Sequence, residues 1–269
     1  MSRLQRVAVH AAVVTDGELL VRGGVLPWAL LAHGETPAAA LQRVLGPGAT
    51  VGELLAVVDG RREHDGLDLH TVHLVLAAAL DGELAGTDRV PVPEGWPLAP
   101  DADVVLDEAE RARLAPVADA SAPVVRQRLA CYAVVVADGA LLLTRLSTVT
   151  PSPGRWTLPG GGVDHGEHPL TAVVREVHEE TGMAVTVTGL AEIGAEHFTG
   201  RSPRGVLEDF HAVRILVTAE PVEVLEPEVL DVGGSTDLAR WVPLAEAETI
   251  GLVGVAQRGL AIARRSAQG

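Results

Sequence analysis

The sequence contains two copies of one pattern, and this internal repeat constrains the fold more than any other feature. Leu26-Pro27 and the triplet His33-Gly34-Glu35 recur 132 positions later as Leu158-Pro159 and His165-Gly166-Glu167. Two further blocks match in the same order along the chain, 16–20 with 138–142 and 70–74 with 211–215. Collinear blocks of this kind indicate that one domain has been duplicated.

The duplication predicts two tandem domains of one fold, at residues 1–120 and 128–269, with a linker at 121–127. In the second domain, Asp138-Gly139 lies between two apolar runs, which predicts a β-hairpin over 129–145. Apolar patterning predicts further strands near 184–194, 210–217 and 238–242, and helices over 245–250 and 253–265.

A glycine-rich turn followed by a helix stands out in the second copy. Residues 158–162 read Leu-Pro-Gly-Gly-Gly, and glycines lack the Cβ atom that keeps a backbone away from a metal or phosphate. Pro169 suits the first position of a helix, and Gly182 suits the residue after its end. These signals predict a helix over 168–181.

Three carboxylates lie on one face of this predicted helix. Glu176 is three residues before Glu179 and four before Glu180, so their side chains project from neighbouring turns. Arg175 can pair with Glu179, but one guanidinium cannot neutralise three carboxylates. The remaining charge calls for cations, and oxygen-only ligands suit Mg²⁺ or Mn²⁺. Glu167, in the loop before the helix, is expected to brace that loop.

From Gly161 to Met183 the fixed positions resemble the Nudix box, G-x5-E-x7-R-E-U-x-E-E-x-G-U with U aliphatic, without a departure. The resemblance implies an α/β fold, here two tandem Nudix-type α/β/α sandwiches with mixed β-sheets. It also implies hydrolysis of a nucleoside diphosphate linked to another moiety, with water attacking phosphorus and Mg²⁺ or Mn²⁺ as cofactor. The resemblance carries over metal binding by Gly161, Glu176, Glu179 and Glu180, and catalytic roles for Glu167, Arg175, Glu179 and Glu180.

The first copy lacks this chemistry. The positions of the three carboxylates are occupied by Val44, Pro47 and Gly48, and Gly161 is matched by Ala29. Pro47 and Gly48 would also end the helix where the ligands should stand. We therefore expect no metal in the first domain, whose role is either to stabilise the second domain or to complete its substrate pocket. The retained residues, Glu35 and Arg43, are predicted to be structural.

Substrate contacts are less clearly marked in the sequence. The general base is expected to be a glutamate of the box or a downstream carboxylate, and ordinary surface roles compete for each downstream candidate. Those candidates are Glu196, Glu208 and Asp209. Arg201 and Arg204 are candidate phosphate clamps or a solvated basic loop. Nucleoside triphosphates, nucleotide sugars and ADP-ribose all remain open as substrates. His197 and His211 are interpreted as structural histidines.

The composition of the chain limits the kinds of partner that it is expected to bind. A net charge of −15 argues against a nucleic-acid surface, and no apolar run approaches the ~18 residues of a membrane span. These features predict a cytoplasmic enzyme for a small nucleotide, either a monomer with an internal pseudo-dimer or a homodimer. One alternative is a nucleotide-sensing or regulatory protein of this fold with little turnover. Another, a prenyl diphosphate isomerase, would need a catalytic cysteine, whereas the single cysteine, Cys131, lies in a predicted core strand.

Overall fold

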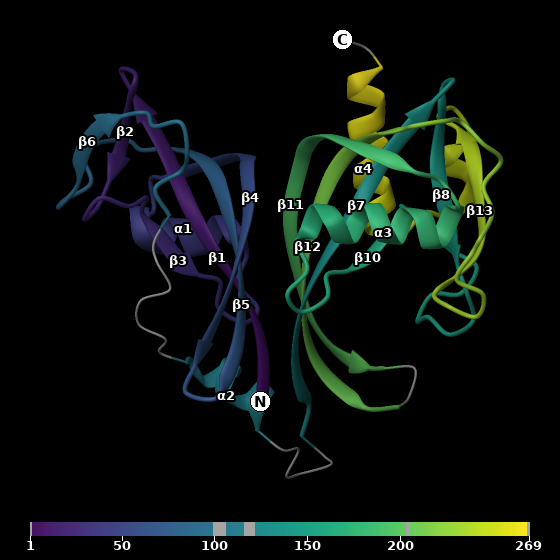
Figure 1. The fold of residues 1–269 in the computed structure, drawn as a ribbon, viewed down its shortest axis with the longest axis horizontal. Helices are drawn as coiled ribbons and strands as arrows, with labels where there is room; N and C mark the ends of the chain where they lie inside the picture. Colours follow the sequence, from purple (N-terminus) through teal and green to yellow (C-terminus); the bar gives the residue numbers. More distant parts are fainter. Residues whose placement is uncertain (1, 99–105, 116–121, 203–204, 268–269) are drawn as a thin grey trace. The chain divides into compact units, whose positions relative to one another are not determined.

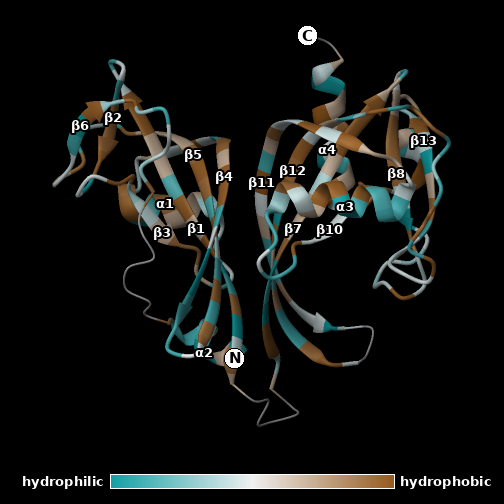
Figure 2. Cartoon of the chain, viewed as in Figure 1, coloured by the Kyte–Doolittle hydropathy of each residue, from teal (hydrophilic) through white to brown (hydrophobic). Residues whose placement is uncertain are grey.

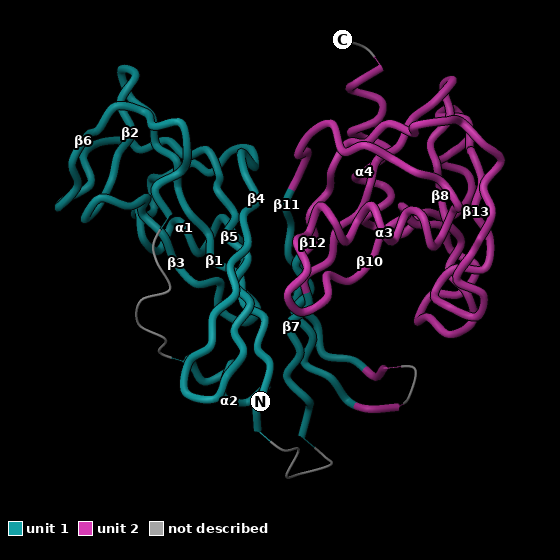
Figure 3. The backbone as a smooth tube through the Cα atoms, viewed as in Figure 1, with its two compact units in different colours: residues 1–128, 193–200, 207–213 teal, residues 129–192, 201–206, 214–269 magenta. Residues whose placement is uncertain are grey.

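The computed structural model describes residues 2–98, 106–115, 122–202 and 205–267, and it divides into two compact units (Figure 3). Unit 1 comprises Met1–Arg128, Ile193–Gly200 and Leu207–Val213. Unit 2 comprises Leu129–Glu192, Arg201–Val206 and Arg214–Gly269. Two short segments of the second half of the chain therefore cluster with the first half.

The first half of the chain builds a six-stranded sheet of order β4-β5-β1-β2-β6, with β3 paired to β1. β1 and β5 are parallel, whereas the pairs β1–β2, β1–β3, β2–β6 and β4–β5 are antiparallel, so the sheet is mixed. The elements are β1 (Ser2–Thr15), β2 (Glu18–Val21), β3 (Trp28–Leu30), α1 (Pro37–Leu45), β4 (Thr50–His64), β5 (Leu67–Ala79), β6 (Asp88–Pro91) and α2 (Glu108–Leu114).

The second half builds a seven-stranded sheet of order β11-β12-β7-β8-β13, with β10 paired to β7 and β9 to β8. Helices α3 and α4 lie on opposite faces of this sheet (Figure 1). The elements are β7 (Val124–Ala137), β8 (Ala140–Leu146), β9 (Trp156–Thr157), β10 (Gly160–Gly162), α3 (Pro169–Thr181), β11 (Val185–Arg201), β12 (Leu207–Pro221), β13 (Thr236–Pro243), a 3₁₀ helix η1 (Ala247–Ile250) and α4 (Gly254–Ser266).

The two sheets share one strand order, which matches the repeat in the sequence. β4, β5, β1, β2 and β6 correspond in turn to β11, β12, β7, β8 and β13, and the short strands β3 and β10 pair with β1 and β7. The α/β fold class predicted from the sequence, with two units of one fold and mixed sheets, is therefore confirmed.

The hairpin turn predicted at Asp138-Gly139 has a counterpart in the first copy. Asp16-Gly17 connects β1 to β2, and Asp138-Gly139 connects β7 to β8. All four residues have positive φ, 55° and 79° in the first turn and 48° and 73° in the second. This is the backbone that a two-residue type I′ turn requires, and the Asp-Gly pair favours it. The predicted turn at Asp138-Gly139 is therefore confirmed.

Several predicted boundaries shift. β11 continues to Arg201 and β12 begins at Leu207, so both strands are longer than predicted. The prediction stopped short because the added residues lack the buried apolar face on which it relied. β7 begins at Val124, inside the segment predicted as a linker, while residue 121 lies outside the described part of the chain. The helix predicted over 245–250 is the short 3₁₀ helix η1.

The core consists of aliphatic residues. In unit 2, side chains of β8, β9 and α4 pack in one cluster that includes Leu141, Trp156, Leu158 and Leu260. Brown, hydrophobic positions follow the strands of both sheets, and α3 carries residues of both kinds (Figure 2). Cys131 is fully buried, and burial raises the pKa of its thiol to about 12, which fits a core thiol. None of the described helices is long and apolar enough to cross a membrane.

Candidate active site on helix α3

Helix α3 begins and ends where its sequence signals predict. The Nδ1 atom of His168, the residue before the helix, accepts a hydrogen bond from the backbone N–H of Leu170 at 3.1 Å. Pro169 occupies the first turn, and Gly182 ends the helix in the left-handed conformation with φ 71°. The helix therefore runs without interruption to the turn that carries Glu179 and Glu180.

Two glycines of β10 let the strand approach its surroundings closely. A Cβ atom on Gly161 would lie 2.6 Å from Oε2 of Glu176, so any larger residue would displace that carboxylate. Gly160 has φ +136°, and a Cβ atom there would lie 2.4 Å from the carbonyl oxygen of Cys131. Glycine is thus required at both positions, once by a side chain and once by the backbone.

Arg175 joins the loop before the helix to two carboxylates on it. Its Nε and Nη2 atoms each donate to one oxygen of Glu167 at 2.9 Å, a bidentate pair. Its Nη1 atom donates to Glu176 at 2.9 Å and to Glu179 at 3.1 Å. The hydrogen bonds from Arg175 lower the pKa of Glu167, and those to Glu167 raise the pKa of Arg175. The predicted contact of Arg175 with Glu179 is confirmed, and Glu167 bonds to Arg175 as a brace would.

Glu180 is the buried member of the three carboxylates, with 5% of its surface exposed. One oxygen accepts the backbone N–H of Gly160 at 3.0 Å, and the other accepts the hydroxyl of Thr236 at 2.6 Å and that of Ser235 at 3.3 Å. Burial raises the pKa of Glu180 to about 7, although these hydrogen bonds oppose the shift. Burial also raises the pKa of Glu176.

The profile of the NUDIX domain matches residues 126–260, half of the chain. The protein belongs to the NUDIX family. The match contains β10, α3 and all four glutamates described above, so the resemblance seen in the box extends over the second half of the chain.

Curated relatives of this NUDIX chain match it over short stretches. The RNA pyrophosphohydrolase of Agrobacterium fabrum is 63% identical over 41 residues, which cover 15% of this chain and 24% of that protein. The nucleoside triphosphatase NudI of Escherichia coli is 38% identical over 65 residues, 24% of this chain and 46% of that protein. The chain thus aligns with less than half the length of either relative. The crystal structure of a MutT NUDIX hydrolase from Burkholderia pseudomallei is 28% identical, with a TM-score of 0.37, and the match covers 51% of this chain and 98% of that one.

NUDIX hydrolases generally use divalent metal ions, and the side chains on α3 fit such an ion. Glu176, Glu179 and Glu180 offer only oxygen atoms, which hard cations prefer. Gly161 leaves room beside the Glu176 carboxylate that a Cβ atom would fill. Burial holds Glu180 partly protonated near neutral pH, and a cation would remove that proton.

A surface pocket of about 390 Å³ lies next to this group of side chains. Ser147, Val149, Val232, Thr236 and Asp237 are among its lining residues. Thr236 links the two features directly, because its hydroxyl donates to Glu180. The pocket, like the three carboxylates, belongs wholly to unit 2.

The residues predicted to contact substrate have partners of their own. Arg201 is exposed and donates from Nη1 to the carbonyl oxygen of Gly205 at 2.8 Å. Glu208 lies 3.6 Å from Arg126, measured between carboxylate oxygen and Nε. Glu196 is exposed on β11, and Asp209 contacts His197. Arg204 lies outside the described residues. The roles proposed for all of them stay predictions.

The sequence alone does not indicate that two hydroxyl residues hydrogen-bond to Glu180. Ser235 and Thr236 lie 55 and 56 residues after Glu180, at the start of β13. Hydroxyl residues near a strand terminus are common, so their contact with Glu180 depends on the strand's register in the sheet. Only the folded chain brings them to the carboxylate.

Proposed function

We propose that the chain hydrolyses a pyrophosphate bond in a nucleoside diphosphate linked to another moiety, with Mg²⁺ or Mn²⁺ as cofactor. The observation that carries the proposal is the arrangement around α3. Three carboxylates project from its last turns, a glycine strand leaves room beside one of them, and Arg175 orients two of them. The family assignment adds independent support.

Each side chain then has a distinct task. Glu176, Glu179 and Glu180, with the backbone of Gly161, would hold the metal. When bound, the metal neutralises negative charge that develops on the phosphate oxygens during attack by water. The bidentate pair of Arg175 with Glu167 fixes the glycine loop against the helix, so the ligands keep their spacing.

The attacking water must give its proton to a carboxylate. Among the glutamates of the box the candidate is Glu180, in a mechanism in which Glu176 and Glu179 alone hold the metal. Glu196, Glu208 and Asp209 are the other candidates. Replacing each of the four by its amide, and measuring the pH–rate profile, identifies the base as the residue whose change removes the acidic limb.

The substrate is proposed to be a small nucleotide, a nucleotide sugar or a molecule of the ADP-ribose class. The names of the relatives from A. fabrum and E. coli add RNA and nucleoside triphosphates to the panel that should be tested. A net charge of −15 favours small substrates over a long polyanion.

The proposal is tested with the full chain, a panel of these substrates, and Mg²⁺ or Mn²⁺. Released nucleoside monophosphate and the second phosphorylated product are measured for the wild type, Glu179→Gln, Glu180→Gln and the surface control Glu223→Gln. We expect turnover by the wild type and the control, and a loss of at least about 100-fold in the two site variants. If the wild type binds a nucleotide but turns over no member of the panel, the nucleotide-sensing alternative is supported instead.

A further inference from the structure

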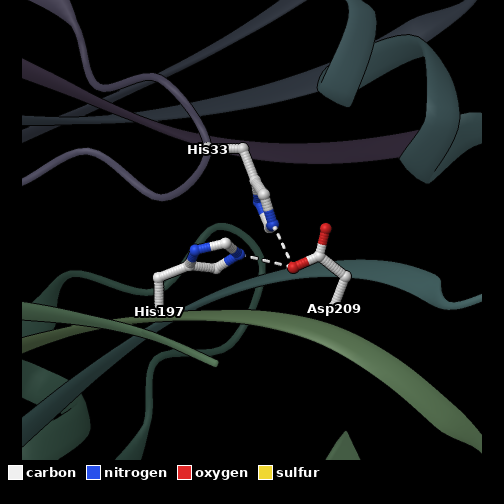
Figure 4. A group of neighbouring side chains, drawn as sticks. All are labelled: His33, His197 and Asp209. Carbon is white, nitrogen blue, oxygen red and sulfur yellow. Dashed lines mark hydrogen bonds and ion pairs between the residues drawn. The ribbon is translucent and has the colours of Figure 1, made fainter. Parts of the chain in front are cut away.

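We propose that His33, His197 and Asp209 form a second metal site, one that takes a transition-metal cation such as Zn²⁺ (Figure 4). The three residues come from different elements: the loop between β3 and α1, strand β11 and strand β12. All three belong to unit 1, whereas the carboxylates of α3 belong to unit 2. The proposal uses none of the α3 carboxylates, and of its three residues only Asp209 is also a candidate for the general base.

The two imidazoles converge on one carboxylate oxygen. Nε2 of His33 lies 3.2 Å and Nε2 of His197 lies 2.5 Å from Oδ1 of Asp209. One donor atom from each residue lies within 4.8 Å of the other two. A tetrahedral zinc site with bonds of ~2.0 Å needs ligand atoms ~3.3 Å apart. The His33–Asp209 distance already fits, and the more exposed ring of His197 can move outward to fit as well.

The chemistry of the donors separates this site from the one on α3. Two imidazole nitrogens and one carboxylate oxygen suit Zn²⁺ and its neighbours among the transition metals, whereas Mg²⁺ prefers oxygen ligands alone. Three protein ligands leave a fourth position of a tetrahedron for water or another small ligand. The two metals should therefore occupy different sites when both are present.

The surroundings of His33 leave a buried nitrogen without a regular partner. Its side chain is 12% exposed, and in the part of the chain that the structure describes neither ring nitrogen makes a hydrogen bond of regular geometry. A buried polar atom without a partner is costly. The group nearest to Nε2 of His33 is Oδ1 of Asp209 at 3.2 Å, and a cation bound by both atoms would give Nε2 a ligand bond.

Neighbouring residues leave room for the convergence of the rings. Gly34 has φ +80°, and a Cβ atom there would lie 3.0 Å from Nδ1 of His197, so glycine lets this ring approach. His211 is the next imidazole, with its ring centroid 5.5 Å from that of His33.

The repeat provides an internal comparison. The match of 70–74 with 211–215 pairs Asp209 with Asp68 of the first copy. Asp68 receives a bidentate pair of hydrogen bonds from Arg61, at 2.7 and 2.6 Å. The carboxylate at this position thus has a permanent cation in the first copy, whereas in the second copy it faces two imidazoles. A metal ion would provide the corresponding positive charge.

The test uses the full chain, stripped of metal with a chelator and held in excess Mg²⁺ so that Zn²⁺ does not occupy the α3 site. Calorimetric titration with Zn²⁺ should show one site per chain. His197→Gln and Asp209→Asn should weaken that binding at least about tenfold, whereas the control His64→Gln, a histidine at the end of β4, should not.

A second measurement needs no variant and so does not depend on how the variants fold. In wild-type protein with ¹⁵N-labelled histidine, Zn²⁺ should shift the Nε2 signals of His33 and His197 and leave those of His64 in place. The proposal is overturned if these signals do not move. It is also overturned if Zn²⁺ binding is lost only in Glu180→Gln and not in the histidine or aspartate variants.

Discussion

The two copies of the repeat share a brace, an arginine of the helix that is bonded to a glutamate of the loop before it. Only the second copy also carries the three carboxylates. In the second copy Arg175 holds Glu167 through two hydrogen bonds of 2.9 Å, and in the first copy Arg43 holds Glu35 through two of 3.1 and 3.0 Å. In both, the same glutamate accepts a backbone N–H from three residues earlier at 3.1 Å. The pair is present in the first copy without the three carboxylates, so the fold keeps it where no metal is expected, and the catalytic roles of Glu167 and Arg175 stay predictions.

The copies differ in the last turn of the helix. α1 has 9 residues and ends at Leu45, whereas α3 has 13 and ends at Thr181. The missing turn is the one that carries Glu179 and Glu180 in the second copy, as the positions of Pro47 and Gly48 predicted. We therefore expect the second copy to bind a metal and the first copy not to.

The short strands before the two helices differ as well. Gly160 and Gly161 of β10 correspond to Trp28 and Ala29 of β3. The N–H of Gly160 donates to Glu180, a contact for which the first copy has no carboxylate. Gly161 is therefore needed by the Glu176 carboxylate and Gly160 by its close approach to β7, whereas β3 pairs with β1 through Trp28 and Ala29.

Converting a ligand of the second copy into its first-copy counterpart should have the largest effect. Glu176→Val reproduces Val44 and removes one carboxylate, so kcat/KM should fall by at least about 100-fold in a steady-state assay with Mg²⁺. The reverse change, Val44→Glu, should add no metal binding because α1 ends one residue later. Activity of Glu176→Val within threefold of the wild type would contradict the assignment of this residue.

Gly161→Ala should have the next largest effect. Its methyl group would lie 2.6 Å from the Glu176 carboxylate and push it out of position. We expect Mn²⁺ affinity, measured by calorimetry, to fall by about 10- to 100-fold. The matched change in the first copy, Ala29→Gly, should leave Mn²⁺ affinity unchanged. Equal behaviour of the two variants would show that the glycine is not specific to the site.

The pH dependence of metal binding should also come from the second copy alone. Burial raises the pKa of Glu180 from 4.5 to about 7, so metal and proton compete for it. Mn²⁺ affinity should rise roughly 20-fold from pH 5.5 to 7.5 as this carboxylate ionises. Without metal, the folded state holds this proton more tightly than the unfolded state, so the free energy of unfolding should fall as pH rises from 4.5 to 7. In Glu180→Gln, both the Mn²⁺ affinity and the free energy of unfolding should depend less on pH. If either quantity kept the pH dependence of the wild type, the proton would belong to another group.

Changes in the brace should have the smallest effect, and that effect should differ between the two copies. Arg175→Lys loses the bidentate geometry, so metal affinity should fall about tenfold. Arg43→Lys makes the same change in the first copy, where the guanidinium is largely exposed, and should cost about 1 kcal/mol of unfolding free energy or less. Urea unfolding and Mn²⁺ titration of both variants check this. A loss of metal affinity in Arg43→Lys would mean that the copies are not independent.

Local signals predicted the helix and the turns of the second copy because neighbouring residues determine them. Pro169, Gly182 and the Asp138-Gly139 turn each act through their own backbone geometry. The hydrogen bond between Gln127 and His211 at 3.1 Å, repeated as Gln5 with His70 at 3.1 Å, fits the interpretation of His211 as structural. These features do not depend on how distant strands align.

Contacts between distant residues could not be predicted in the same way. Ser235 and Thr236 reach Glu180 only because β13 takes its place beside β8. His33, His197 and Asp209 meet although more than 160 residues separate the first two, and interpreting His197 as a purely structural histidine gave no hint of the cluster. Strand register and packing decide such contacts, and a single sequence carries little information on either.

The central claim is that only the second copy forms a catalytic metal site. The most direct test is an anomalous difference map from crystals of the full chain soaked in Mn²⁺ with a nucleotide. We predict peaks at Glu176, Glu179 and Glu180, with the nucleotide phosphates beside them, and none at Val44, Pro47 and Gly48. A peak at α1, or a nucleotide bound with no Mn²⁺ at the α3 carboxylates, would contradict the claim.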